Sequence, residues 1–243
     1  MDQQQSNEWK LGSDGFFIRG AEMTRLETFV DAAFAFTVTL LVVGGGDSTP
    51  NSLEELVTAL KGVPAFLACF VNLMFFWYAH YRWSRRYGLE DLPSTLLSVG
   101  LVFVVLIYVY PLKAMYSSAL NFFSGDYLPT DVPIDSPGDL RFLFVLFGAG
   151  FASMSVVIAL LDLYAYRIAD SLKLTARERF DTFTAVLAWL ICVLFALVSI
   201  GIAGFAPNAA LVMAGFVYAG FGIVMPALSV TRERRWKKLA AAA

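Results

Sequence analysis

Six long runs of apolar residues, separated by shorter polar segments, divide the chain. Each run is continuous and does not alternate between apolar and polar residues, which predicts α-helices and excludes the strands of a β-barrel. An α-helix rises about 1.5 Å per residue and the hydrocarbon core of a bilayer is about 30 Å thick, so a crossing needs roughly 20 apolar residues. The six runs of this length cover approximately residues 25–43, 63–81, 95–112, 142–166, 183–205 and 209–229. We therefore predict an all-α integral membrane protein with six transmembrane helices.

Polar segments flank these runs at both ends. Residues 1–24 lack the short apolar core and small-residue cleavage site of a secretory signal, so we interpret them as a cytoplasmic tail. Residues 230–243 contain the string RERRWKK, which is typical of a basic anchor beside anionic lipid. The sequence thus predicts an N-terminal tail (1–24), a membrane domain (25–229) and a basic C-terminal cytoplasmic tail (230–243).

The composition excludes a water-soluble globule. Of the 243 residues, 58% are hydrophobic and 16% are charged, whereas an ordinary soluble domain is about 25% charged. The chain holds 22 Phe, 10 Tyr and 5 Trp residues, more than one soluble core can cover, so we expect membrane lipids to be partners. A net charge of −2 offers no general attraction for nucleic acid. Cys69 and Cys192 lie inside apolar runs, which fits neither a disulfide framework nor a zinc site.

The placement of Lys and Arg predicts the orientation in the membrane. If the N-terminus is cytoplasmic, 15 of the 18 Lys and Arg residues fall on the cytoplasmic side, and only Lys61, Lys113 and Arg141 fall outside. Cytoplasmic loops carry the excess of these residues in membrane proteins. We therefore predict a multi-pass protein of the cell inner (plasma) membrane, with both termini in the cytoplasm.

The first apolar run differs from the others because it contains the ionisable residues Arg25, Glu27 and Asp31. Such residues are costly inside a membrane and tend to mark function. At about 100° per residue, Glu27 and Asp31 share one side of the helix with Phe34 and Val38. The opposite side forms a stripe of mostly apolar residues with one hydroxyl, which consists of Arg25, Phe29, Ala32, Phe36, Thr39, Leu40 and Val43.

The second run offers partners for Asp31. Trp77 and His80 lie at a similar depth to Asp31 and share a helix face, so they are candidates for an inter-helix polar contact with its carboxylate. For His80, the alternative is an interfacial ring in an aromatic belt. Asn72 lies deeper in the same run and is a candidate bridge between helices. Because Asp31 faces away from the stripe, we interpret this set, together with Arg25, as support for the first helix and not as an ion site.

Two segments resemble a known family. The string RLETFVD of residues 25–31, followed by AFTVTLL of residues 35–41, is similar to the first helix of the transmembrane protein 175 potassium channels. The hallmark of that helix is R-x-x-x-F-S-D, matched here at Arg25, Phe29 and Asp31, followed by a run of the type A-I-x-x-T-L-L. The Trp77 and His80 pair resembles the W-x-x-H element of the second helix in that family.

The resemblance implies a subunit of six helices. It further implies that four subunits form a homotetramer, in which the first helix of each subunit lines the pore. It implies that Phe36, Thr39, Leu40 and Val43 line the ion path, and helical periodicity places the same residues on the stripe. It also implies K⁺ as the permeant ion, monovalent cations as ligands and no cofactor. Two positions depart from the family pattern, since Val30 replaces the motif serine and Phe36 replaces the usual isoleucine of the narrow gate.

Other functions fit the sequence less well. The chain has no T-V-G-Y-G filter, so selectivity would require a ring of side chains. The first-run motif occurs once, so such a ring requires oligomerisation. The alternative is a proton-coupled or solute secondary transporter, for which Asp162 is a further interior carboxylate, although helix packing accounts for this residue as well. The absence of H-E-x-x-H and G-x-S-x-G motifs argues against an enzyme.

The pore roles of Phe36 and Thr39 each have an alternative interpretation. Phe36 is predicted to form a hydrophobic gate that excludes ions by dewetting, or else to pack between subunits. Thr39 is predicted to contact passing cations transiently through its hydroxyl, or else to donate this hydroxyl to the carbonyl of Ala35.

Overall fold

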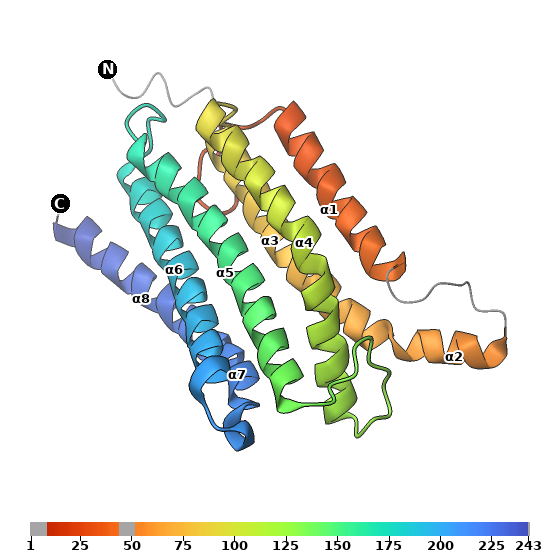
Figure 1. The fold of residues 1–243 in the computed structure, drawn as a ribbon. Helices are drawn as coiled ribbons and strands as arrows, with labels where there is room; N and C mark the ends of the chain where they lie inside the picture. The colour runs from red at the N-terminus through yellow and green to blue at the C-terminus, as the bar shows by residue number, and fades with distance from the viewer. Residues whose placement is uncertain (1–8, 44–51, 243) are drawn as a thin grey trace.

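The computed structural model describes residues 9–43 and 52–242, and within these ranges it is helical apart from turns, loops and a single antiparallel bridge between Leu11 and Phe17. Long helices lie side by side and alternate in direction, whereas α2 projects sideways from one end and α8 diverges from the other long helices (Figure 1). The elements are α1 (Arg25–Val43), α2 (Leu53–Lys61), α3 (Val63–Tyr87), α4 (Leu92–Phe123), α5 (Pro137–Arg167), α6 (Ala176–Phe205), the 3-10 helix η1 (Asn208–Ala210), α7 (Met213–Phe216), the 3-10 helix η2 (Val217–Gly220) and α8 (Phe221–Ala242).

The start of α1 and the end of α8 lie at the same end of the bundle (Figure 1). Helices α3 and α5 also end there, and α4 and α6 begin there. We call this the basic end, because most Lys and Arg residues of the described chain belong to the helix termini and loops that meet there. The opposite end carries α2 and the loop that joins α4 to α5.

The described chain is helical, as predicted, and five of its stretches, one fewer than the predicted six, are long and apolar enough to cross a membrane. These stretches are Leu53–Tyr87, Leu92–Phe123, Pro137–Arg167, Ala176–Phe205 and Asn208–Ala241. Helix α1 is not among the five, but it has the predicted bounds and its 19 residues extend for about 28 Å. It lies along α3 and α4 at the edge of the bundle (Figure 1).

Helices α4, α5 and α6 begin earlier than predicted, because polar side chains cap them before the apolar runs. The carboxylate of Asp91 accepts a hydrogen bond from the backbone N–H of Ser94 at the start of α4. Capping boxes formed by Ser136 with Asp139 and by Thr175 with Glu178 begin α5 and α6. Each cap satisfies backbone N–H groups that a helix start would otherwise leave without partners.

The last predicted span is not one regular helix. A short 3-10 helix, α7 and a second 3-10 helix precede α8, which then continues without a break from Phe221 through the basic string to Ala242. Gly215 and Gly220 lie in the interrupted part, where their low helix propensity favours departures from regular geometry.

The core is built on close contact of α5 with α4 and α6. Gly150 of α5 makes one of these contacts possible, because a Cβ atom there would lie 2.1 Å from the ring of Tyr108 on α4. Tyr108 is only 1% exposed. Aromatic rings fill the centre, where Phe76 packs edge-on against Phe151 and stacks on Trp189.

Residues 9–24 pack against the basic end of the bundle and lead directly into α1. We call them the N-terminal strap. Phe16 is 2% exposed and packs edge-on against Tyr87. Both guanidinium Nη atoms of Arg19 donate to the carboxylate of Glu178, at 2.8 and 2.9 Å. A Cβ atom at Gly20 would lie 2.4 Å from the carbonyl oxygen of Ser84, so only glycine allows the strap to approach α3 this closely. The strap thereby fixes the start of α1.

Candidate functional site

Helix α1 has one buried and one exposed face. Val30, Phe34 and Leu41 are at most 2% exposed and pack into the core beside α3 and α4. On the opposite face, Phe29 is 51% exposed and Phe36 is 56% exposed. The full exposed set is Arg25, Thr28, Phe29, Ala32, Ala35, Phe36, Thr39 and Val42. A large aromatic side chain in the middle of such a helix must face either lipid or another protein surface.

The exposed face agrees with most of the predicted stripe. Arg25, Phe29, Ala32, Phe36 and Thr39 belong to both sets. Leu40 differs, because it is half-buried and packs against the core, which places it at the edge of the face. The side chain of Val43, also assigned to the stripe, lies outside the described residues.

The predicted contact between Asp31 and Trp77 is confirmed. The indole Nε1–H of Trp77 donates a 2.8 Å hydrogen bond to Oδ1 of Asp31, and the Trp77 ring stacks on Tyr81 with centroids 5.6 Å apart. This hydrogen bond ties α1 to α3. Arg25 is not part of the network, since it is exposed and makes no hydrogen bond or ion pair with any residue that the structure describes.

The predicted contact between His80 and Asp31 is wrong. His80 is 1% exposed, and its Nε2 lies 2.9 Å from Oγ of Ser98 on α4. An offset of three residues turns His80 about 60° around α3 from Trp77, which is enough to direct it to α4 when Trp77 faces α1. The interfacial belt is wrong as well, because the ring is buried beside Trp83.

A second connection between α1 and α3 was missed by sequence reasoning. Glu27 is 2% exposed, its backbone N–H donates to Oγ1 of Thr24, and its carboxylate lies 3.6 Å from Nε of Arg85. The available signal was spacing, because Arg85 lies eight residues after Trp77 and Glu27 lies four residues before Asp31. Both positions therefore repeat the faces that bring Asp31 and Trp77 together.

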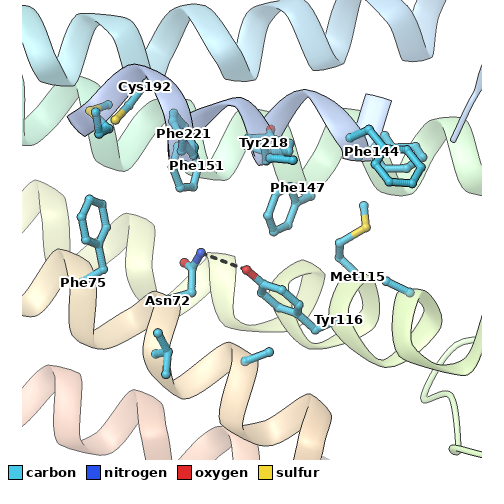
Figure 2. A pocket seen from close by; sticks show the side chains of 18 of the residues that line it. Asn72, Phe75, Met115, Tyr116, Phe144, Phe147, Phe151, Cys192, Tyr218 and Phe221 are labelled. Atoms are coloured by element: carbon cyan, nitrogen blue, oxygen red, sulfur yellow. Dashed lines mark hydrogen bonds between the residues drawn. The ribbon is translucent and has the colours of Figure 1, made fainter. Parts of the chain in front are cut away.

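Asn72 bridges two helices, as predicted. Its Nδ2–H donates to the hydroxyl of Tyr116 on α4 over 3.4 Å (Figure 2). Sequence reasoning did not identify Tyr116 as the partner. The carbonyl oxygen of the Asn72 side chain is buried and has no hydrogen-bond partner in the described part of the chain.

The hydroxyl of Thr39 donates to the carbonyl of Ala35 over 3.1 Å, which is the alternative that the sequence left open. The bond uses the proton of the hydroxyl and leaves the lone pairs of Oγ1 available to a cation. Thr39 remains exposed, so the oxygen can still meet a passing ion. Thr37 makes the equivalent bond to Ala33 on the buried side, where it serves only the helix.

The motif position held by Val30 is fully buried, at 0% exposure. Its side chain packs within the core cluster, so an apolar residue fits this environment without leaving a hydroxyl to satisfy. In the part of the chain that the structure describes, no group of three or more His, Cys, Asp or Glu side chains is arranged to hold a metal ion.

Comparison with known proteins relates this geometry to ion channels. Residues 25–111 match the family described as "Endosomal/lysosomal potassium channel TMEM175". A protein of Marivirga tractuosa named "Potassium channel" is 34% identical over 181 residues, which cover 72% of this chain and 72% of that protein. A crystal structure of the potassium channel MtTMEM175, a variant bound to a nanobody fusion protein, matches with a TM-score of 0.75 and 30% identity, covering 91% of this chain and 97% of that one. The matched residues 25–111 include the exposed face of α1 and the Asp31–Trp77 bond.

Proposed function

The chain belongs to the TMEM175 family, and on this premise we propose that it is a potassium-permeable cation channel whose ion path is lined by α1. One observation carries the proposal. Helix α1 buries one face against its own subunit and leaves the opposite face exposed, and this face carries Phe36 and Thr39 in the middle of the helix. A single helix cannot enclose a pore, so four copies would place these faces around one axis.

Membrane orientation follows from the basic end. We propose that α1 is the sixth crossing beside the five long apolar stretches and that the basic end lies in the cytoplasm, as the excess of Lys and Arg favours. Both termini would then be cytoplasmic. Helix α2 and the loop between α4 and α5 would lie on the outer side.

The proposed gate is formed by Phe36. Four phenyl rings on the axis would make an apolar constriction, and such a constriction excludes ions by dewetting even when it is not sterically closed. Thr39 lies about one helical turn further along the exposed face. Its four oxygens would partly replace the water around a cation, and because hydroxyls are neutral, we expect only a weak preference among monovalent cations.

Ion flux into liposomes that contain the purified protein tests this function. We expect passive K⁺ flux down its concentration gradient, smaller Na⁺ flux and no dependence on a proton gradient. Flux that requires a proton gradient and saturates at low substrate concentration would support the secondary transporter instead. Vesicles of the same lipid composition without protein are the control for ion leak through the bilayer.

A further inference from the structure

A cavity of about 1610 Å³ lies on the far side of α3 from α1. Helix α3 forms one wall, α6 and α8 with the short helices before it form the other, and α4 and α5 form the floor (Figure 2). The lining residues Leu67, Val71 and Phe75 of α3 are about half exposed or more. The cavity is therefore open along its length to the surface of the bundle.

Most of the lining is apolar and aromatic. Phe147, Phe151, Tyr218 and Phe221 face the space from the floor and the α8 wall, and Phe75 faces it from α3 (Figure 2). An apolar cavity of ~150 Å³ can stay dry and empty, but this space is roughly tenfold larger and is open to the surface of the bundle. We therefore expect an apolar occupant.

The part of the cavity at the basic end is polar, and several groups there lack partners. The indole Nε1–H of Trp83 is buried and has no acceptor in the described chain. Asp162, which lines the same part, is 5% exposed and forms no hydrogen bond or ion pair with any described residue, although the guanidinium groups of Arg82 and Arg86, which also line the cavity, attract its carboxylate. Unpaired buried polar groups are rare in folded proteins, and each one calls for a partner.

Two further groups have an incomplete pairing. Oδ1 of Asp181 and Nε of Arg232 lie 3.7 Å apart as an ion pair, but neither atom makes a hydrogen bond within the described ranges. Together with Trp83 and Asp162, they offer two N–H donors and two carboxylates in one part of the cavity. Asp181 already accepts from Arg177 through its other oxygen, Oδ2. A ligand with a negatively charged acceptor for the two N–H groups and a positively charged donor for the two carboxylates would complete the hydrogen bonding of all four groups.

Depth along the helices places this polar part at the level of lipid head groups. Arg82, which also lines it, follows Val63 at the start of α3 by 19 residues, or about 28 Å of helix. This distance is close to the thickness of the hydrocarbon core. The apolar part of the cavity then lies at the depth of the acyl chains.

We propose that this cavity binds a phospholipid whose head group carries both a phosphate and a primary ammonium group, as in phosphatidylethanolamine. The acyl chains lie among the aromatic side chains. Trp83 and Arg232 donate to the phosphate, and the carboxylates of Asp162 and Asp181 accept from the ammonium. This proposal concerns lipid binding and stands whether or not the protein conducts ions.

Lipid retention measured by native mass spectrometry tests the proposal. The protein is equilibrated with equal amounts of phosphatidylethanolamine, phosphatidylcholine and phosphatidylglycerol, and the lipids that remain bound are counted. Phosphatidylcholine has a trimethylammonium that cannot donate a hydrogen bond, and phosphatidylglycerol has no cation. We expect at least tenfold greater retention of phosphatidylethanolamine, and equal retention of the three lipids would overturn the proposal.

Matched variants locate the site. Asp162→Asn is expected to lower the preference for phosphatidylethanolamine about tenfold, and Arg232→Gln, which removes a phosphate donor, to lower the retention of all three lipids. Asp170→Asn and Arg234→Gln, which change exposed residues outside the cavity, should leave both unchanged. Trp83→Phe keeps an aromatic ring and removes the N–H, so it remains informative if Asp162→Asn does not fold. Trp236→Phe is its control, because Trp236 lies outside this cavity. Retention that is unaffected in Asp162→Asn, Arg232→Gln and Trp83→Phe would contradict the assignment.

A neighbouring subunit is the competing occupant. Val71→Cys, at an exposed position that lines the cavity, distinguishes the two. We expect a membrane-soluble maleimide to label this cysteine in the assembled protein, with the parent chain as control for the buried Cys69 and Cys192. Protection of Val71→Cys in the assembly, with labelling after denaturation, would show that protein covers the cavity and would overturn the lipid proposal.

Discussion

The indole of Trp77 holds the carboxylate of Asp31 at 2.8 Å across the contact between α3 and α1. The carboxylate lies on the side of α1 that faces its own subunit, whereas Phe36 and Thr39 lie on the exposed side. The bond therefore fixes the rotation of α1 about its axis. In the proposed channel, rotation of this helix would decide which side chains face the pore.

Replacement of Asp31 tests this supporting role. Asp31→Ala leaves the Trp77 N–H without its acceptor, which typically costs ~1–3 kcal/mol, so we expect lower thermal stability of the assembled protein and lower expression. Size-exclusion chromatography with a temperature series measures both, and Asp170→Ala at an exposed site is the control. Normal assembly combined with a sharply altered ion selectivity would instead identify Asp31 as an ion site.

Replacement of Thr39 tests the polar ring. Thr39→Val keeps the shape of the side chain and removes the oxygen, so we expect the K⁺ to Na⁺ permeability ratio, measured from reversal potentials, to fall toward one. Thr37→Val removes a hydroxyl from the buried side of the same helix and should leave the ratio unchanged. A ratio that stays the same in Thr39→Val excludes a role in selectivity.

Replacement of Phe36 tests the gate. If Phe36 forms the proposed apolar constriction, Phe36→Ala removes it, so we expect increased basal cation leak into liposomes at equal protein content. If Phe36 packs between subunits, the same change will mainly break the assembly, which chromatography detects. An intact assembly without additional leak would contradict the gate.

The N-terminal strap contributes a separate stability prediction. Arg19→Gln leaves the carboxylate of Glu178, whose side chain is 0% exposed, without its charged partner, and such a change typically costs ~3–5 kcal/mol. We expect a large fall in unfolding temperature, and Arg19→Gln combined with Glu178→Gln should recover part of it. Arg179→Gln breaks an exposed pair with Asp170, which is worth only ~0–1 kcal/mol. Equal effects of Arg19→Gln and Arg179→Gln would show that the strap contact is not stabilising.

The sequence predicted those features that depend on short-range periodicity. The bounds of α1 followed from its apolar run and its charges, and the Asp31–Trp77 contact followed from depth along two antiparallel helices. His80 was misplaced because depth does not specify the direction of a side chain around a helix, and a rotation of about 60° directed it to α4. Depth and periodicity on one helix pair cannot resolve such a difference.

Features that depend on distant residues were not predictable. The sequence predicted a polar tail at residues 9–24. It did not predict their packing, because the partner of Arg19 is Glu178, which lies 159 positions away in the chain. The cavity likewise depends on how α3, α6 and α8 diverge, which the sequence of each single helix does not predict. Asp162 was noticed as an interior carboxylate, but its missing partners became apparent only in three dimensions.

Cysteine modification in the conducting protein tests most directly whether the exposed face of α1 lines the ion path. In Thr39→Cys, a small water-soluble methanethiosulfonate cation should react with the new thiol and block most of the K⁺ flux. In Thr58→Cys, on the exposed helix α2, it should react without a block, and the parent chain should not respond because Cys69 and Cys192 are buried. Complete modification of Thr39→Cys with undiminished K⁺ flux would contradict the account.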